Sequence, residues 1–304
     1  MGGPIHLDCR PDFAYNIMYI PGSSNGRTRA FGARYRGSNP RPGARFICPL
    51  ASDELLLTHR RMQAPALTRM YPSPIMAQMR NPFSGIRAVL FDMDGTLVET
   101  NIDFPLMRRE MVALGTRYGI PESDMQGRDI LGVVDLVVES LTKRGEEPEA
   151  LKARQEAFEK LEQIELVHSD DAHEIPCAHE LLEALRNGGM KVGIITRNCR
   201  AAVNLSLERA HISADLVLTR DDVYRTKPHP GHVLRALEIF NVPPKEALVV
   251  GDHRMDIASG KAAGARTIGF LRPDRPEDSF DEVEPDLIVR SLKELLDLAE
   301  RLYT

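Results

Sequence analysis

Residues 87–96 read RAVLFDMDGT. The apolar run Ala88 to Phe91 is too short for a helix and predicts a buried strand, which ends at two carboxylates, Asp92 and Asp94. Ligands of open α/β sheets bind beyond the carboxyl ends of the strands. Carboxylates packed so closely repel each other unless a cation joins them, and Mg²⁺ prefers oxygen ligands. An Asx turn closing a strand is the plainer alternative for this stretch alone.

Two further polar segments are candidates for binding a phosphoryl group. The apolar run 191–195 predicts a strand and ends at Thr196, Arg197 and Asn198. A hydroxyl and free backbone N–H groups at this point suit a phosphate. The alternative is that the threonine is only the N-cap of the helix that follows. Lys227 lies in the segment Thr226-Lys227-Pro228-His229-Pro230. The two prolines stiffen that loop, so we expect Lys227 to neutralise a phosphoryl group or a carboxylate.

A third strand, 247–250, also stops at an acid. Gly251 precedes Asp252, and Asp256 follows four residues later at the start of a predicted helix. We expect Gly251 to let the backbone turn and present Asp252 beside the first pair. Asp256 alone would read as an acid favoured by the helix dipole.

Taken in order, these four segments resemble the four motifs of the haloacid dehalogenase superfamily of phosphatases, and the resemblance runs from about residue 85 to the end of the chain. It implies that Asp92 is a nucleophile forming an aspartyl-phosphate and that Asp94 is the acid/base. It implies that Thr196 and Lys227, with Arg197 and Asn198 beside them, hold the phosphoryl group. It also implies a Mg²⁺ cofactor bound by Asp92, the backbone carbonyl of Asp94 and Asp252, with Asp256 nearby.

The function that follows is hydrolysis of a small phosphomonoester, most like that of the phosphoglycolate-phosphatase branch. A phosphomutase of the same fold would share all four motifs, and a non-catalytic binding module is a third reading. Dehalogenation is disfavoured because a halide leaving group needs no proton from Asp94. The expected partner is a small phosphorylated metabolite, with no nucleic acid and no membrane; we expect a cytoplasmic protein, and the sequence gives no oligomeric state.

Beyond residue 85 the chain alternates strands and helices, which predicts an α/β fold: a Rossmann-like parallel sheet with helices on both faces. The hundred residues between Asp94 and Thr196 are too many for a simple crossover and contain three helical stretches, so we predict an inserted small α-helical cap at 101–173 and a core at 81–100 and 174–304. The expected strands lie near 87–91, 191–195, 215–218, 247–250, 266–270 and 286–289, and the cap helices near 104–118, 128–143 and 147–167.

Three cap arginines, Arg108, Arg109 and Arg128, are candidates for gripping a second anionic group of the substrate, although surface charge is the commoner role of such residues. The acid- and histidine-rich segment 168–174 resembles a ligand cluster but falls where the cap returns to the core, so a solvated hinge is the preferred interpretation. The four cysteines show no metal-ligand or disulfide spacing.

Residues 1–80 differ from the rest of the chain. They hold eleven Arg, no Lys and four acidic residues, a net charge of +7, so the other 224 residues carry −12 of the total −5. Without an apolar period they predict a disordered extension. An organellar transit peptide and a nucleic-acid-binding arm are two interpretations. The one we favour is a mis-annotated start, because Ser23–Arg27 and Tyr35–Pro40 resemble a translated transfer-RNA gene; translation would then begin at Met70, Met76 or Met79.

Overall fold

A computed structural model describes residues 81–301. The predictions for the N-terminal extension, residues 1–80, and for its alternative start sites therefore lie outside the described residues.

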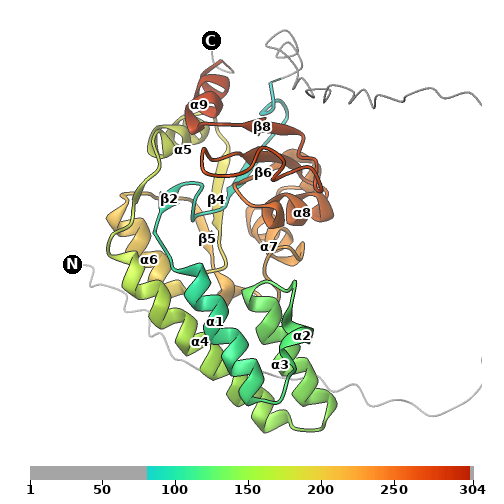
Figure 1. Ribbon diagram of the computed structural model, residues 1–304. Coiled ribbons are helices and arrows are strands. Elements are labelled where there is room, and N and C mark those ends of the chain that lie inside the picture. Colours follow the sequence, from blue (N-terminus) through green and yellow to red (C-terminus); the bar gives the residue numbers. More distant parts are fainter. Residues whose placement is uncertain (1–80, 302–304) are drawn as a thin grey trace, which may run out of the picture. The chain divides into compact units, whose positions relative to one another are not determined.

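Six parallel strands form the central sheet, in the order β5-β4-β1-β6-β7-β8 (Figure 1). Every one of the six predicted strands is present and begins within one residue of the expected position. Their bounds are β1 Ala88–Phe91, β4 Lys191–Ile195, β5 Leu216–Leu218, β6 Ala247–Gly251, β7 Arg266–Phe270 and β8 Leu287–Val289.

Strand β1 is the point at which the strand order reverses. It pairs in parallel with β4 through Phe91 and Ile194, and with β6 through Phe91 and Val250. All four of its residues are buried, as expected for a strand with neighbours on both sides and helices on both faces. Asp92 therefore emerges at a topological switch point, which is where ligands bind in sheets of this kind.

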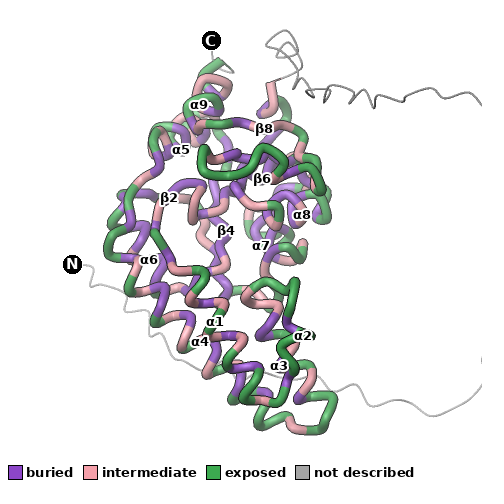
Figure 2. Tube along the Cα trace, in the orientation of Figure 1, coloured by how far each residue is buried: buried purple, intermediate pink, exposed green. Residues whose placement is uncertain are grey.

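Helices cover both faces of the sheet (Figure 1). Apolar side chains on one face pack with α5 (Ala178–Asn187), α6 (Arg200–Arg209) and α9 (Leu292–Glu300). The opposite face packs with α7 (Gly231–Phe240) and α8 (Arg254–Ala263). Figure 2 shows the strands in buried colours with exposed residues on the outer turns of the helices. This two-sided burial explains the continuous apolar runs of the strands.

The chain leaves this sheet after β1 and forms a helical insertion before returning. A short antiparallel pair joins the two crossings, β2 (Val98–Glu99) and β3 (His173–Glu174). Between them lie α1 (Phe104–Arg117), α2 (Glu122–Met125), α3 (Ile130–Lys143) and α4 (Glu147–Ser169), which share a separate apolar core. We call residues 101–173 the cap and the rest of the described chain the core. The predicted α/β Rossmann-like fold with an inserted helical cap is confirmed.

A few details differ from expectation. The pair β2–β3, the four-residue helix α2 and the 3-10 helices Arg220–Asp222 and Pro244–Glu246 were not predicted, because segments this short carry no readable period. The last helix begins after its N-cap, Ser291, whose hydroxyl accepts from the N–H of Glu294. The Glu294 carboxylate accepts from the N–H of Arg290 at 3.1 Å. None of the helices within residues 81–301 is both long and apolar enough to span a bilayer.

Candidate active site

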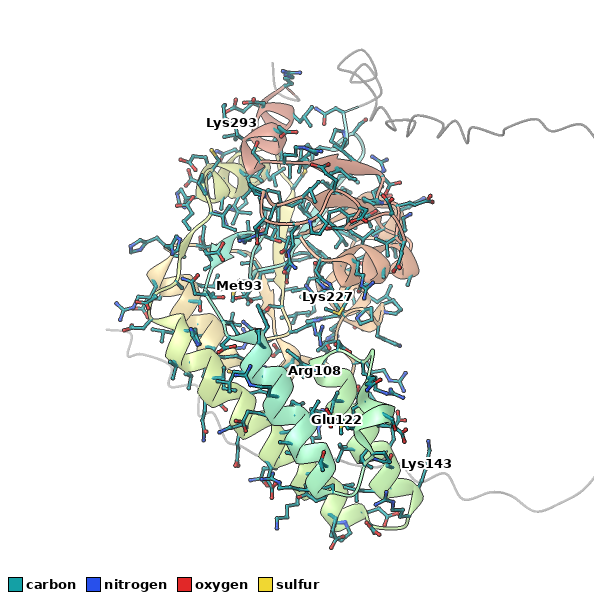
Figure 3. The ribbon with its side chains drawn as sticks, in the orientation of Figure 1. Met93, Arg108, Glu122, Lys143, Lys227 and Lys293 are labelled. Carbon is teal, nitrogen blue, oxygen red and sulfur yellow. The ribbon has the colours of Figure 1, made fainter. Side chains whose placement is uncertain are left out.

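The polar residues of the site follow adjacent strands. Asp92 follows β1, Thr196 follows β4 and Asp252 follows β6, and these three strands are neighbours in the sheet. Lys227 comes from the loop that precedes α7 and is labelled in Figure 3. Because the strands are parallel, their carboxyl ends meet at one edge and bring the side chains together.

A buried ammonium bridges two of the carboxylates. The Nζ atom of Lys227 lies 2.6 Å from Oδ1 of Asp92 and 2.6 Å from Oδ1 of Asp256, and the lysine side chain is only 2% exposed. Asp252 completes a group of three carboxylates whose ligand atoms all lie within 4.8 Å of one another. The Lys227 ammonium thus contacts two of three closely spaced carboxylates.

The pKa values of Asp92, Asp252 and Lys227 are all raised in this environment. Burial, which the attraction of Lys227 only partly offsets, raises the pKa of Asp92 from 3.8 to about 6. Burial and then the Asp92 and Asp256 charges raise the pKa of Asp252 to about 8. Burial works to lower the pKa of Lys227, but the Asp256 and Asp92 carboxylates hold that pKa above its usual value. Lys227 therefore stays protonated, and additional positive charge nearby would favour the ionised form of the carboxylates.

Asp94 lies apart from that group and has its own donors. Its Oδ1 accepts from the Thr100 hydroxyl at 2.6 Å, and its Oδ2 accepts from the Asn198 amide at 2.7 Å and from the Thr196 hydroxyl at 3.5 Å. Burial, followed by repulsion from Asp92, raises the pKa of Asp94 to about 7. The two aspartates of the first motif thus occupy different environments, as two different chemical roles require.

Two glycines make room for this arrangement. Gly95 has φ of +79°, and a Cβ there would lie 2.6 Å from Oδ2 of Asp252. A Cβ on Gly251 would lie 2.4 Å from the Asp256 side chain. We predicted that Gly251 permits a sharp turn; it is instead the last residue of β6, outside the positive-φ glycines, and its role is to leave space for Asp256.

The segment that follows β4 has one side chain that contacts the candidate site and another that contacts the cap. The Asn198 amide binds Asp94, as described above. The Arg197 guanidinium pairs with Asp129 of the cap and lies 2.7 Å from Sδ of Met255. Arg197 therefore sits at the boundary between core and cap, which its place beside Thr196 in the sequence did not reveal.

The three cap arginines have different surroundings. Arg108 of α1, labelled in Figure 3, donates to the carbonyl of Met125 at 2.7 Å and to the carbonyl of Arg128. Arg128 is exposed and donates to the carbonyl of Asp124 at 3.2 Å. Arg109 is exposed. Arg108 thus connects parts of the cap, and no contact described here joins any of the three to the carboxylates.

Sequence reasoning missed several residues of the site. Thr96 accepts from the N–H of Asp252 at 3.1 Å, and Thr100 donates to Asp94. Arg275 lies 3.7 Å from Oδ2 of Asp252. His253, by contrast, lies inside the fourth motif where the sequence favoured a helix start, and it is the N-cap of α8, with its Nδ1 accepting from the N–H of Met255. The two threonines follow the first motif closely enough to be suspected, whereas Arg275 is distant in sequence and carries no local signal.

The donor set suits Mg²⁺. Asp92, Asp252 and Asp256 offer hard carboxylate oxygens at close range, as Mg²⁺ prefers. Within residues 81–301 this is the one group of three or more acidic, histidine or cysteine side chains close enough to share an ion. The 168–174 segment forms no such group; part of it is β3.

The chain is similar to known proteins. The family model of haloacid dehalogenase-like hydrolases matches residues 89–270. Pyrophosphatase PpaX of Bacillus mycoides (strain KBAB4) is 29% identical over 223 residues, which cover 71% of this chain and 98% of that protein.

Two solved structures have similar folds. One, described as a haloacid dehalogenase-like hydrolase from Bacteroides fragilis, is 22% identical with a TM-score of 0.52 and covers 69% of this chain and 99% of its own. The other, described as a predicted phosphoglycolate phosphatase from Haemophilus somnus 129PT, is 22% identical with a TM-score of 0.48 and covers 70% of this chain and 98% of its own. The family match spans more than half of the chain and includes all four motif positions. The chain therefore belongs to the haloacid dehalogenase-like hydrolases.

Proposed function

We propose that this protein is a Mg²⁺-dependent phosphatase that hydrolyses a small phosphomonoester through an aspartyl-phosphate on Asp92. The observation that carries the proposal is the separation of the two aspartates of the first motif. Asp92 is held by the Lys227 ammonium at 2.6 Å, whereas Asp94 is held by neutral donors from Thr100 and Asn198. A charged nucleophile and a proton-transferring acid need such different environments.

In the first step, a carboxylate oxygen of Asp92 attacks phosphorus and the ester P–O bond breaks. Asp94, whose pKa of about 7 keeps a proton available near neutral pH, protonates the leaving alkoxide. In the second step, Asp94 takes a proton from water, the water oxygen attacks phosphorus, and the bond to Asp92 breaks. Inorganic phosphate leaves, and both aspartates return to their starting states.

Positive charge supports both steps. Lys227 contributes a fixed ammonium beside the nucleophile, and Thr196 contributes a hydroxyl at the end of β4. Mg²⁺ held by Asp92, the backbone carbonyl of Asp94 and Asp252, with Asp256 nearby, would supply the remaining neutralisation of phosphoryl charge. Phosphoryl transfer depends mainly on such positioning and charge stabilisation.

A second candidate substrate is inorganic pyrophosphate. The Bacillus mycoides relative reported above is named a pyrophosphatase, and the alignment covers 98% of that protein. The same site would serve, because only the leaving group changes from an alkoxide to a phosphate. A phosphomutase remains the alternative from a different reaction class.

A panel of substrates with Mg²⁺ present tests these proposals. It should include an aryl phosphate, 2-phosphoglycolate, hexose phosphates, pyrophosphate and a haloacid, with phosphate release and product identity both measured. We expect phosphate release that chelation abolishes and Mg²⁺ restores. Isomerised hexose phosphate without phosphate release would establish the mutase instead, and halide release would overturn the proposed reaction.

A further inference from the structure

A second buried ion pair lies away from the carboxylate group. Glu165 of the cap helix α4 pairs with Arg220, the first residue of the 3-10 helix Arg220–Asp222 that follows β5. Their side chains are 0% and 2% exposed. Since this pair joins cap to core beneath the surface, neither residue serves as a solubilising charge.

Both members of the pair also bind the backbone beside the active site. The second carboxylate oxygen of Glu165 accepts from the N–H of Cys199 at 2.9 Å. Arg220 donates to the carbonyl of Arg197 at 3.1 Å. The pair therefore holds the residue before and the residue after Asn198.

Asn198 in turn holds the proposed acid. Its amide donates to Asp94 at 2.7 Å, and its side chain is buried. Thr196 has a separate anchor, because its N–H donates to the carbonyl of Leu218 of β5 at 2.9 Å. The backbone of Asn198 has its own bonds, since its N–H donates to the Thr196 hydroxyl at 3.3 Å and its carbonyl accepts from the N–H of Arg220 at 3.2 Å. The side chains of Glu165 and Arg220 add bonds to the two residues that flank Asn198.

Stability alone is a poor explanation for this pair. Replacing a buried ion pair with apolar side chains of similar size is often neutral or stabilising, because desolvation of the two charges offsets their attraction. The Nε of Arg220 is also buried with no hydrogen-bond partner in the described part of the chain. An imperfectly satisfied pair in such a place is better explained by the geometry that it imposes.

We propose that Glu165 and Arg220 are positioning residues: together they fix residues 197–199 so that the Asn198 amide stays on Asp94, and they tie the cap helix α4 to that arrangement. The proposal rests on the proposed function, because it assigns Asp94 a proton-transfer role. It predicts an effect on the chemical step that is separable from the effect on folding.

The chain offers a matched control. Arg209 of α6 and Asp170, which follows α4, form another ion pair between cap and core, but their side chains are 52% and 65% exposed. Asp170→Asn removes a cap–core charge contact without touching the 197–199 segment. We expect Asp170→Asn to keep kcat within about two-fold of the unmodified protein, since exposed pairs contribute little.

The first experiment compares Glu165→Gln with that control on the best substrate from the panel. We expect kcat to fall about 10- to 100-fold, because small displacements of a catalytic group are costly, while KM and inhibition by inorganic phosphate stay within about three-fold. An unchanged kcat in the folded Glu165→Gln variant would overturn the proposal.

The second experiment separates positioning from stability. In Glu165→Leu/Arg220→Met both charges are replaced by apolar groups, so the melting temperature should exceed that of Glu165→Leu alone, which leaves the buried Arg220 charge unpaired. We expect kcat to remain low in this variant even though folding is restored. Recovery of kcat together with the melting temperature would show a merely structural role and contradict us.

A double-mutant cycle checks the route through Asn198. If Glu165 acts through that amide, Glu165→Gln should cost less than about three-fold in an Asn198→Ala background. Fully additive losses would refute the proposed route. Failure of the proposed function looks different: the unmodified protein would then show no Mg²⁺-dependent phosphate release, whereas failure of the present inference leaves that activity intact.

Discussion

The two buried ion clusters of this molecule differ in their balance of charge. Around Lys227, one buried ammonium contacts Asp92 and Asp256, while Asp252 lies beside them with the exposed Arg275 at 3.7 Å. Around Arg220, one guanidinium faces the single carboxylate of Glu165. Both clusters are removed from water, so charge that is not neutralised internally raises the free energy of the folded state.

The cluster around Lys227, with its excess of carboxylates, is suited to bind a ligand, whereas the Glu165–Arg220 pair is suited to hold the backbone in place. The Lys227 cluster holds three carboxylates around one buried ammonium, with the exposed Arg275 guanidinium 3.7 Å from Asp252, and this donor set suits a divalent cation. In the Arg220 pair the two charges are equal: Glu165 and Arg220 each also bind a backbone atom, and the Nε of Arg220 has no partner in the described part of the chain. Its expected effect is on geometry, and the following changes test the contrast.

The largest effect is expected when the ammonium is removed from the group of carboxylates around Lys227. Lys227→Met removes the ammonium from between Asp92 and Asp256, so turnover should fall by at least about 10³-fold. Without Mg²⁺ the free energy of unfolding should also drop by roughly 3–5 kcal/mol, because two buried carboxylates lose their partner. Steady-state kinetics and denaturant unfolding measure the two quantities.

Lys261→Met is the control for that experiment, since Lys261 is an exposed residue of α8. It should match the unmodified protein in both measurements. Near-normal turnover in folded Lys227→Met would mean that the buried ammonium has no part in the reaction.

A smaller effect is expected when pH changes the ionisation of these carboxylates in the metal-free protein. The folded-state pKa values of about 6 for Asp92 and about 8 for Asp252 lie above the ordinary 3.8. These groups therefore contribute their stabilisation below about pH 4 and lose it as the pH rises through those two values. The metal-free melting temperature should fall between about pH 5 and about pH 8.5, and less steeply in Asp252→Asn.

Mg²⁺ should reverse that loss. Because it binds the ionised carboxylates, it should raise the melting temperature more at about pH 8.5 than at about pH 5, and Asp252→Asn should diminish the increase. An equal Mg²⁺ effect in both proteins at both pH values would place the ion elsewhere.

The smallest effects are expected in the cap, outside both clusters. Arg108→Ala removes donors to two cap carbonyls and should lower the free energy of unfolding by about 1–2 kcal/mol. Arg109 and Arg128 are exposed and stay candidates for substrate choice. If either grips a second anion, its Ala variant should lower kcat/KM for the preferred substrate while sparing an aryl phosphate. Equal losses on both substrates would argue against a specificity role.

The sequence predicted much of the fold because strong local patterns determine it. The apolar runs of β1, β4 and β6 each end in a polar residue, and parallel strands bring such ends to one edge. The Thr100–Asp94 bond, the Arg275–Asp252 contact and the Glu165–Arg220 pair were not predicted. Such contacts depend on side-chain directions and on residues up to 156 positions apart, as for Thr96 and Asp252, and no periodicity records them.

The central claim is that Asp92 is the attacking group, and Asp92→Asn tests it most directly. The amide keeps the shape of the side chain but removes the charged nucleophile. Turnover of the best phosphate ester in the presence of Mg²⁺, measured beside a melting curve that verifies folding, should fall by about 10³-fold or more. Turnover within about ten-fold of the unmodified protein, in a folded Asp92→Asn variant, would contradict the account.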